Sequence, residues 1–232
     1  MIHLVAESDA MREVVRLAER VAPTDANVLL TGESGTGKDA LARLIHEKSR
    51  RASAGEYVRI DCAALPGDLL EAELFGYERG AFTGAVAQKP GRVEVAHKGT
   101  LVLDEIAHLP TDAQAKLLRV IEEREFERLG GQRTIKVDAR LIALTNVDLE
   151  AAVKRRAFRE DLFYRLNVVH IHVPPLRDRR DDVRPLAMNL LSVAAQKHGR
   201  QLSEFSIEAL ALLEEYDFPG NVRSWLTPSN EP

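Results

Sequence analysis

Short runs of apolar residues recur along most of the chain, separated by amphipathic stretches. Each run has the length of a typical strand and is rich in Val, Ile and Leu, a composition that predicts β-strands. Because helical patterns lie between the runs, the sequence predicts an α/β sheet whose faces are covered by helices. The predicted strands are Val28–Thr31, Tyr57–Ile60, Thr100–Leu103, Arg140–Leu144 and Val168–Val173.

The stretches between these runs place apolar side chains at helical spacing. Thr111, followed three residues later by Gln114, has the pattern of a capping box and predicts where the third helix begins. The helical positions are Ala40, Leu41, Leu44 and Ile45 in the first helix, Leu69, Leu70, Glu73 and Leu74 in the second, and Ala113, Leu117, Val120 and Ile121 in the third.

The alternation ends at a double proline, Pro174-Pro175. Only helical patterns follow it, over Val183–Lys197 and Ser206–Tyr216, and Ser206 is the expected N-cap of the last helix. The chain is therefore expected to divide into an α/β core over 1–173, a small helical subdomain over 174–223 and a polar tail over 224–232 that frays. The apolar stripe of the last helix is expected to comprise Ile207, Leu210 and Leu213.

A glycine-rich segment lies between the first predicted strand and the first strong helix, which is the context that a phosphate-binding loop requires. Glycines let backbone N–H groups face phosphate oxygens, while the helix N-terminus and a lysine add positive charge. The alternative is an ordinary glycine-rich turn, but the lysine and both flanks argue against it. The predicted nucleotide-binding residues are Gly32, Glu33, Ser34, Gly35, Thr36, Gly37 and Lys38.

A pair of acidic residues, Asp104-Glu105, ends the third predicted strand. Their side chains should emerge at the carboxyl edge of the sheet, where ligands of α/β proteins bind. Asp104 is predicted to hold Mg²⁺ and Glu105 to act as general base on the attacking water. Asp39 follows the loop lysine where most phosphate loops carry Ser or Thr, and its carboxylate is a second candidate Mg²⁺ ligand. A plain charged turn is the alternative for Asp104-Glu105 alone.

Composition and charge narrow the classes of partner. Lys and Arg number 32 and Asp and Glu 36, a net charge of −4 that argues against a dedicated nucleic-acid-binding domain. A single cysteine, Cys62, allows no intramolecular disulfide, so a cytoplasmic location is expected. No apolar run reaches the length of a membrane span, and the charged N-terminus does not resemble a signal peptide.

One more segment, Gly80-Ala81-Phe82-Thr83-Gly84-Ala85, lies between a predicted helix and the acidic pair. Its two glycines frame small residues with one aromatic ring and one hydroxyl, which predicts a mobile surface loop. An exposed Phe between glycines suits an anchor for a protein partner. A buried Phe in an ordinary turn is the alternative that these residues alone leave open.

With this hexapeptide, the sequence resembles the AAA+ domain of the sigma-54-dependent transcriptional activators, the bacterial enhancer-binding proteins, of which GAFTGA is the signature. The resemblance runs from about Leu4 to Arg223. Further matching segments are GESGTGK, CAAL (Cys62–Leu65), ELFG (Glu73–Gly76), LDEI (Leu103–Ile106), the run Gln114–Gly131, FREDLFYRLNVV (Phe158–Val169), PPLRDRR (Pro174–Arg180) and FPGNVR (Phe218–Arg223).

The resemblance implies an ATP-hydrolysing motor with ATP and Mg²⁺ as cofactors. It implies a three-layer AAA+ sandwich with a five-stranded parallel sheet and a helical lid. In the family, the GAFTGA loop contacts sigma-54 through the positions of Phe82 and Thr83, and the motor remodels the closed complex of sigma-54 RNA polymerase holoenzyme. Glu125–Thr134 resembles a second surface loop that moves with the first, although a plain hairpin turn is the alternative. Family members usually carry Glu at the position of Asp39, which keeps that position acidic.

The resemblance also assigns roles to single residues. Thr145 and Asn146 match sensor I beside the γ-phosphate, and Arg223 matches sensor II, which contacts the nucleotide from the lid. Arg159 and Arg165 match arginine fingers that reach into the nucleotide of a neighbouring subunit. Fingers that act in trans imply a ring, which in this family is usually a hexamer.

Two departures from the family pattern keep a second function open. Asp61 stands where the family usually has an Asn that restrains the catalytic Glu, and a like charge there predicts altered coupling between phosphate sensing and loop motion. The match stops at Arg223, so a truncated lid is expected, with DNA contact only through a domain outside this chain. The alternative function is a nucleotide-binding interaction module with impaired turnover.

Overall fold

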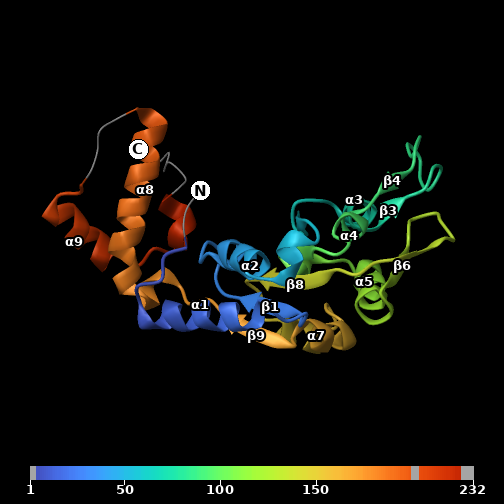
Figure 1. Ribbon diagram of the computed structural model, residues 1–232, viewed down its shortest axis with the longest axis horizontal. Coiled ribbons are helices and arrows are strands. Elements are labelled where there is room, and N and C mark those ends of the chain that lie inside the picture. The colour runs from blue at the N-terminus through green and yellow to red at the C-terminus, as the bar shows by residue number, and fades with distance from the viewer. Residues whose placement is uncertain (1–3, 200–203, 226–232) are drawn as a thin grey trace.

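The computed structural model describes residues 4–199 and 204–225. At its centre is a parallel sheet (Figure 1). Its five strands have the order β2-β5-β8-β1-β9. The five predicted strands are confirmed, each to within one residue at either end. Their bounds are β1 (Val28–Thr31), β2 (Tyr57–Asp61), β5 (Thr100–Asp104), β8 (Arg140–Thr145) and β9 (Val169–His172).

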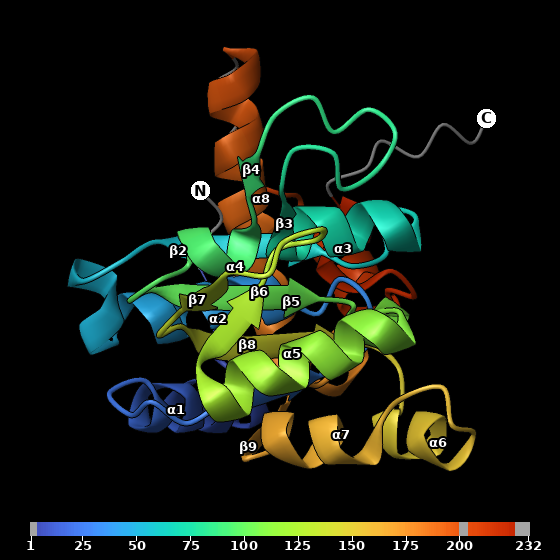
Figure 2. The ribbon, with the colours of Figure 1, turned by 90° about the vertical axis from the view of Figure 1, so that its right-hand side faces the viewer.

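Helices cover both faces of this sheet (Figure 2). Successive residues of a strand face opposite sides, so β5 serves two cores at once. Leu101 and Leu103 belong to a core with α3 (Gly67–Phe75), α5 (Thr111–Glu123), α6 (Leu149–Lys154) and α7 (Glu160–Leu166). Val102, between them, belongs to a second core with α1 (Asp9–Val21) and α2 (Lys38–Glu47). This three-layer arrangement confirms the predicted fold class.

A helical lid follows the sheet and consists of α8 (Val183–His198) and α9 (Ile207–Glu215). Short 3-10 turns over Leu176–Asp178 and Arg180–Asp182 join it to β9. A separate small core holds the lid together, and Val5 from the N-terminal segment packs against it. The buried members of this lid core are Leu176, Val183, Leu186 and Phe218.

The last helix departs in part from its predicted packing. Ser206 is its N-cap as predicted, because the hydroxyl accepts a hydrogen bond of 3.2 Å from the N–H of Ala209. Leu213 packs against the lid core, and Leu210 is half-buried. Ile207 is instead 82% exposed. Helix α9 packs against α8 at the surface, and none of the described residues of α9 is buried.

The capping box predicted at the start of α5 is wrong. Pro110 is the N-cap, and the structure shows no side-chain capping bond there. Gln114 is 1% exposed and faces inward, where its Nε2 donates to the carbonyls of Leu109 (2.8 Å) and Ala157 (3.2 Å). Pro110 has no N–H to offer a capping side chain, and the buried Gln114 amide instead takes the carbonyls that packing places beside it.

Two small hairpins and a short helix, α4 (Arg92–Val95), lie at the end of the molecule opposite the lid (Figures 1 and 2). A bridge between Tyr77 and Leu129 links the hairpins. The first hairpin carries the GAFTGA segment between its strands. The hairpin strands are β3 (Gly76–Tyr77) with β4 (Lys89–Pro90), and β6 (Glu125–Glu127) with β7 (Thr134–Lys136). The fraying expected for 224–232 falls mostly on residues outside the described ranges.

Candidate functional site

Three neighbouring strands end at the same edge of the sheet and bring the predicted site together. The phosphate loop follows β1, the acidic pair follows β5, and Asn146 follows β8. A cavity of about 640 Å³ at this edge is lined by loop, strand and lid residues, among them Lys38, Asp39, Asp104, Glu105 and Arg223. Parallel pairing therefore assembles residues that are far apart in the sequence.

Lys38, in the first turn of α2, is folded back onto its own loop. Its Nζ donates to the carbonyls of Gly32 (2.7 Å) and Glu33 (3.0 Å), and the residue is 6% exposed. Burial lowers the pKa of the Lys38 ammonium, while the charges of Glu105 and Asp104 oppose that shift. The ammonium thus lies at the loop that would carry phosphate, as predicted, and helps to hold the loop in shape.

Two loop glycines also serve the lid. Gly35 has φ 79°, and a Cβ there would lie 2.5 Å from the carbonyl oxygen of Gly220. Gly32 has φ 143°, and a Cβ there would lie 2.5 Å from the oxygen of Val173. These glycines are therefore required by the close approach of the β9–lid segment as well as by the left-handed backbone.

The lid docks on the loop through side chains that sequence reasoning left unassigned. Asn221 is fully buried, donates from Nδ2 to Glu33 Oε2 and Ser34 O (both 3.1 Å), and accepts from the N–H of Leu176 (2.7 Å). Arg177 forms a two-bond pair with Glu33 (2.9 and 2.5 Å). Hydrogen bonds from Arg177 and Asn221 lower the pKa of Glu33 to about 2. The motifs PPLRDRR and FPGNVR contained both residues, but their partners are visible only in the fold.

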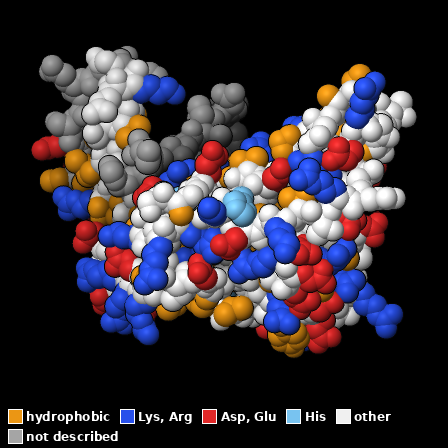
Figure 3. All heavy atoms as spheres, turned by 45° about the vertical axis from the view of Figure 1, so that its right-hand side comes forward, with side chains coloured by type: hydrophobic (Ala, Val, Ile, Leu, Met, Phe, Trp, Pro, Cys, Tyr) orange, Lys and Arg blue, Asp and Glu red, His pale blue; other side chains and the backbone are white. Residues whose placement is uncertain are grey.

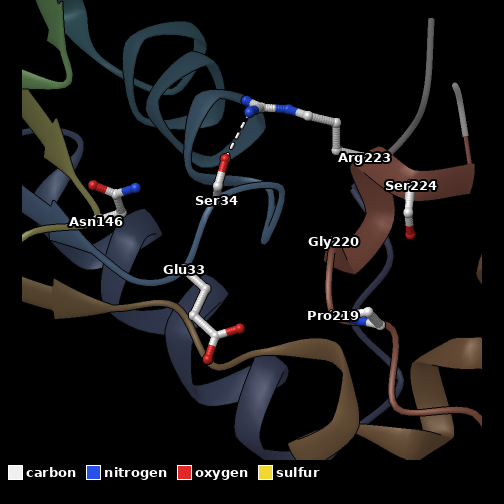
Figure 4. Close-up of a pocket in the computed structure, with 7 residues that line it drawn as sticks. All are labelled: Glu33, Ser34, Asn146, Pro219, Gly220, Arg223 and Ser224. Carbon is white, nitrogen blue, oxygen red and sulfur yellow. Dashed lines mark hydrogen bonds between the residues drawn. The ribbon is translucent and has the colours of Figure 1, made fainter.

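Arg223 and Asn146, the predicted sensors, line one pocket of about 510 Å³ with Glu33 and Ser34 (Figure 4). Arg223 Nη1 donates to Ser34 Oγ at 2.6 Å. Asn146 comes from the opposite side, and its backbone N–H lies 3.4 Å from Glu105 Oε2. Thr145 is buried, and its hydroxyl accepts from the N–H of Val147. The structure thus places both predicted sensor residues in one pocket beside the phosphate loop.

The acidic pair sits where the sequence predicted it. Asp104 is 8% exposed, and Glu105 follows in a left-handed conformation with φ 52°. Asp61 at the end of β2 is the register partner of Asp104. It is exposed and accepts a hydrogen bond of 2.9 Å from the N–H of Ala63. The effect of Asp61 on Glu105 therefore stays a prediction, while Asp61 itself is held by the backbone of its own turn.

Asp39 and Asp104, the two predicted Mg²⁺ ligands, are linked by a residue that the sequence analysis overlooked. Arg59 from β2 forms ion pairs with both carboxylates, through Nη2 to Asp104 and through Nε to Asp39 (3.3 Å). Tyr57 also donates to Asp39 (3.1 Å), and burial, followed by the charge of Asp39, raises the pKa of that phenol. Converging carboxylate oxygens fit Mg²⁺, which uses one or two carboxylates together with phosphate oxygens. Among the described residues, no group of three or more His, Cys, Asp or Glu side chains is arranged to hold a metal ion.

The two predicted arginine fingers lie outside this cavity. Arg159 is exposed and pairs with Asp161 at 2.7 Å, and Arg165 is exposed and pairs with Glu122 at 2.7 Å. They flank α7: Arg159 is its N-cap, and the carbonyl of Arg165 accepts from Asn27, just before β1. The two side chains therefore start from opposite ends of a helix at the surface.

The GAFTGA segment forms a surface turn on the first hairpin, closed by hydrogen bonds from Gly80 N to Ala85 O (2.8 Å) and from Ala85 N to Phe82 O (3.0 Å). Phe82 is 43% exposed, and its ring meets the Tyr77 ring edge-on at 4.9 Å. Thr83 and Gly84 are exposed beside it. Hydrophobic side chains gather at the protruding tip in Figure 3. The open alternative of a buried Phe is thus excluded.

Arg128 ties the two hairpins together. Its side chain is 10% exposed and pairs with Glu94 on α4 and with Glu78 beside the GAFTGA turn (2.8 and 2.9 Å). A Cβ on Gly130 would lie 2.8 Å from that of Ala81, so the second turn touches the first directly. The predicted second surface loop is in contact with the GAFTGA hairpin.

Comparisons with known proteins agree with this geometry. The family described as the Sigma-54 interaction domain matches residues 4–172, and the AAA+ ATPase lid domain matches residues 177–224. The chain belongs to the Sigma-54 interaction domain family. The lid match ends within one residue of Arg223, next to the docking contacts described above.

Several bacterial regulators are similar to this chain over most of its length. The chain is 52% identical over 221 residues to the Regulatory protein AtoC of Escherichia coli, covering 95% of this chain and 48% of that protein. It is 52% identical to the Nif-specific regulatory protein of Rhizobium leguminosarum bv. trifolii, covering 95% of this chain and 62% of that protein. The chain therefore spans about half of these relatives.

Solved structures are similar to this chain in fold. NtrX from Brucella abortus in complex with ATP has a TM-score of 0.89 and 38% identity, covering 100% of this chain and 52% of that chain. Hsp104 shares the fold with a TM-score of 0.67 at 17% identity.

In the described ranges, none of the helices combines the length and hydrophobicity of a membrane span.

Proposed function

We propose that this domain is a Mg²⁺-dependent ATPase motor of the cytoplasm that contacts sigma-54 through Gly80–Ala85 and remodels the closed complex of sigma-54 RNA polymerase. The observation that carries the proposal is the pairing, in one domain, of a phosphate-loop cavity with an exposed aromatic turn at its far end. The regulators that share half of their length with this chain support the same role.

In this proposal, the loop Gly32–Lys38 holds the phosphates of ATP through its backbone N–H groups, and Lys38 exchanges loop carbonyls for phosphate oxygens. Asp104 and Asp39 hold Mg²⁺, which when bound neutralises phosphate charge. Glu105 accepts a proton from the attacking water. NtrX, a solved relative at 38% identity, was obtained with ATP and with ADP, which supports this use of the cavity.

Completion of the site requires a second copy of the chain. Arg159 and Arg165 face solvent with only local carboxylates as partners among the described residues, which suits arginines that act on the nucleotide of a neighbour. We therefore propose a ring, with a hexamer as the assembly. DNA contact is assigned to segments of the full protein other than this domain.

The contact with sigma-54 is tested by Thr83→Ala. Thr83 is exposed on the turn at the opposite end of the molecule from the lid, so its loss should leave ATP turnover within about twofold of the parent. Binding to sigma-54 in the presence of ADP and aluminium fluoride should be lost in a gel-shift assay. Thr111→Ala, an exposed threonine at the start of α5, is the control and should bind normally. Normal binding by Thr83→Ala contradicts the proposed role of the turn.

A further inference from the structure

Arg59 occupies a place that the chemistry of phosphate-loop proteins gives to a metal ion. Its guanidinium reaches two carboxylates on different elements: Asp104 at the end of β5, and Asp39 in the first turn of α2. These are the two residues that the chain offers as Mg²⁺ ligands. One cation thus already bridges both acids in this conformation.

The ion pair between Arg59 and Asp104 is largely buried at its Asp104 end. The Asp104 side chain is 12% exposed, and a carboxylate that is so nearly buried requires a compensating positive charge. Arg59 supplies that charge, while its own side chain stays 41% exposed and therefore free to withdraw towards solvent. The pair with Asp39 is half-exposed and correspondingly weak.

A second group fixes Asp39 independently. Tyr57, two residues before Arg59 on the same face of β2, donates to the same carboxylate oxygen that Arg59 approaches. The Tyr57 ring in turn lies under the guanidinium of Arg43 at 4.4 Å. Asp39 therefore keeps one partner when Arg59 leaves, so withdrawal of Arg59 would not release the ligand from the site.

We propose that Arg59 is a positioning residue that holds Asp39 and Asp104 in place of Mg²⁺ and sets the Mg²⁺ concentration at which nucleotide binds tightly. This inference rests on the proposed Mg²⁺-dependent ATPase. Arg59 and a divalent ion compete for the same oxygens, because adding two positive charges beside a guanidinium is electrostatically unfavourable. ATP binding with Mg²⁺ therefore includes the displacement of Arg59 from the acids.

The test compares Arg59→Met, which keeps the length and loses the charge, with Arg59→Lys. A fluorescent ATP analogue is titrated at fixed concentration with Mg²⁺, and the half-saturating Mg²⁺ is recorded. We expect Arg59→Met to lower that value by about tenfold, the scale for loss of a hydrogen bond to a charged group, and Arg59→Lys to lower it less. Arg43→Met is the matched control from the same cavity. If Arg43→Met shifts the half-saturating Mg²⁺ concentration equally, the proposal is overturned, because the loss of any positive charge from the cavity would then explain the effect.

Thermal unfolding supplies a readout that does not depend on turnover. With a chelator and no nucleotide, Arg59→Met should unfold at a lower temperature than the parent, because Asp104 has lost its counter-charge. Millimolar Mg²⁺ should restore the unfolding temperature of Arg59→Met far more than it raises that of the parent. A deficit of the same size with and without Mg²⁺ would show a purely structural role and overturn the proposal.

Different results would contradict the role of Arg59 and the Mg²⁺-dependent ATPase. If Mg²⁺ strengthens nucleotide binding in the parent and Arg59→Met leaves the half-saturating Mg²⁺ unchanged, only the role of Arg59 is wrong. If Mg²⁺ affects neither the parent nor Arg59→Met, and Asp104→Asn behaves like the parent, the Mg²⁺-dependent ATPase itself is wrong.

Discussion

Glu105 is held in a conformation that few residues adopt. Its φ of 52° lies in the left-handed region, which is costly for a residue with a Cβ and recurs at functional sites. The turn Ile106–His108 follows directly, and the side chain lies near the backbone of Asn146. The strand end and the unusual backbone together aim the carboxylate along the edge where phosphate would lie.

Replacing this carboxylate should separate binding from hydrolysis. Glu105→Gln keeps the shape of the side chain and loses the base, so ATP turnover is expected to fall by roughly a hundredfold or more. Affinity for a fluorescent ATP analogue should change little. Phosphate release and nucleotide titration check the two expectations, with Glu56→Gln, an exposed acid outside the cavity lining, as control. Turnover near the parent rate would show that another group is the base.

Helix α5 positions the segment of the proposed arginine fingers through one buried side chain. Gln114 binds the carbonyl of Ala157 with its Nε2 and the N–H of Arg159 with its Oε1, at 3.2 and 2.8 Å. Arg159 is the N-cap of α7, so the amide fixes where that helix starts relative to α5. Thr111, which the sequence paired with Gln114, is exposed, and no side-chain capping bond is made at this helix start.

This arrangement predicts opposite outcomes for the two residues. Gln114→Met leaves one buried carbonyl, one part-buried carbonyl and one part-buried N–H without this partner, so the free energy of unfolding is expected to fall by about 1–3 kcal/mol. ATP turnover should fall as well, because Arg159 loses its fixed position, while nucleotide affinity stays unchanged. Thr111→Ala should alter the free energy of unfolding by less than about 0.5 kcal/mol. Denaturant unfolding measures both, and a larger loss for Thr111→Ala would restore the capping box.

On the scale of the whole molecule, the phosphate-loop cavity and the proposed arginine fingers lie on different surfaces. The cavity opens between the sheet edge and the lid, whereas α7 presents Arg159 and Arg165 to solvent. The GAFTGA hairpin projects from the end opposite the lid (Figure 1). In the proposed ring, a chain would hold nucleotide at one place and complete the site of its neighbour from another, as head-to-tail cyclic assemblies allow.

Such an assembly makes specific activity depend on protein concentration. Turnover per subunit should rise with concentration, and the Lys38→Ala and Arg165→Ala variants should each be nearly inactive alone. Mixed together, they should recover part of the activity, because one kind of mixed interface keeps both an intact loop and an intact finger. The measurement is phosphate release across dilution and mixing ratio. Constant specific activity with no recovery on mixing would mean that one chain contains the complete site, or that the domain only binds nucleotide.

The sequence by itself determined the elements and the chemistry that depends on local order. Apolar runs of strand length fixed the five strands, since period and composition are local properties. The phosphate loop and the pair Asp104-Glu105 followed from residue types at fixed distances from a strand end. The GAFTGA match led to the family that the comparisons show.

Tertiary structure decided every contact between distant segments. Nothing in the strand Tyr57–Ile60 marked Arg59 as the partner of Asp39 and Asp104, because that contact needs three elements in one sheet order. The inward turn of Gln114 and the docking of Asn221 on the phosphate loop arose in the same way. Local patterns specify which polar groups a chain carries, but a buried polar group takes whichever partner packing places beside it, and only the folded chain sets that neighbourhood.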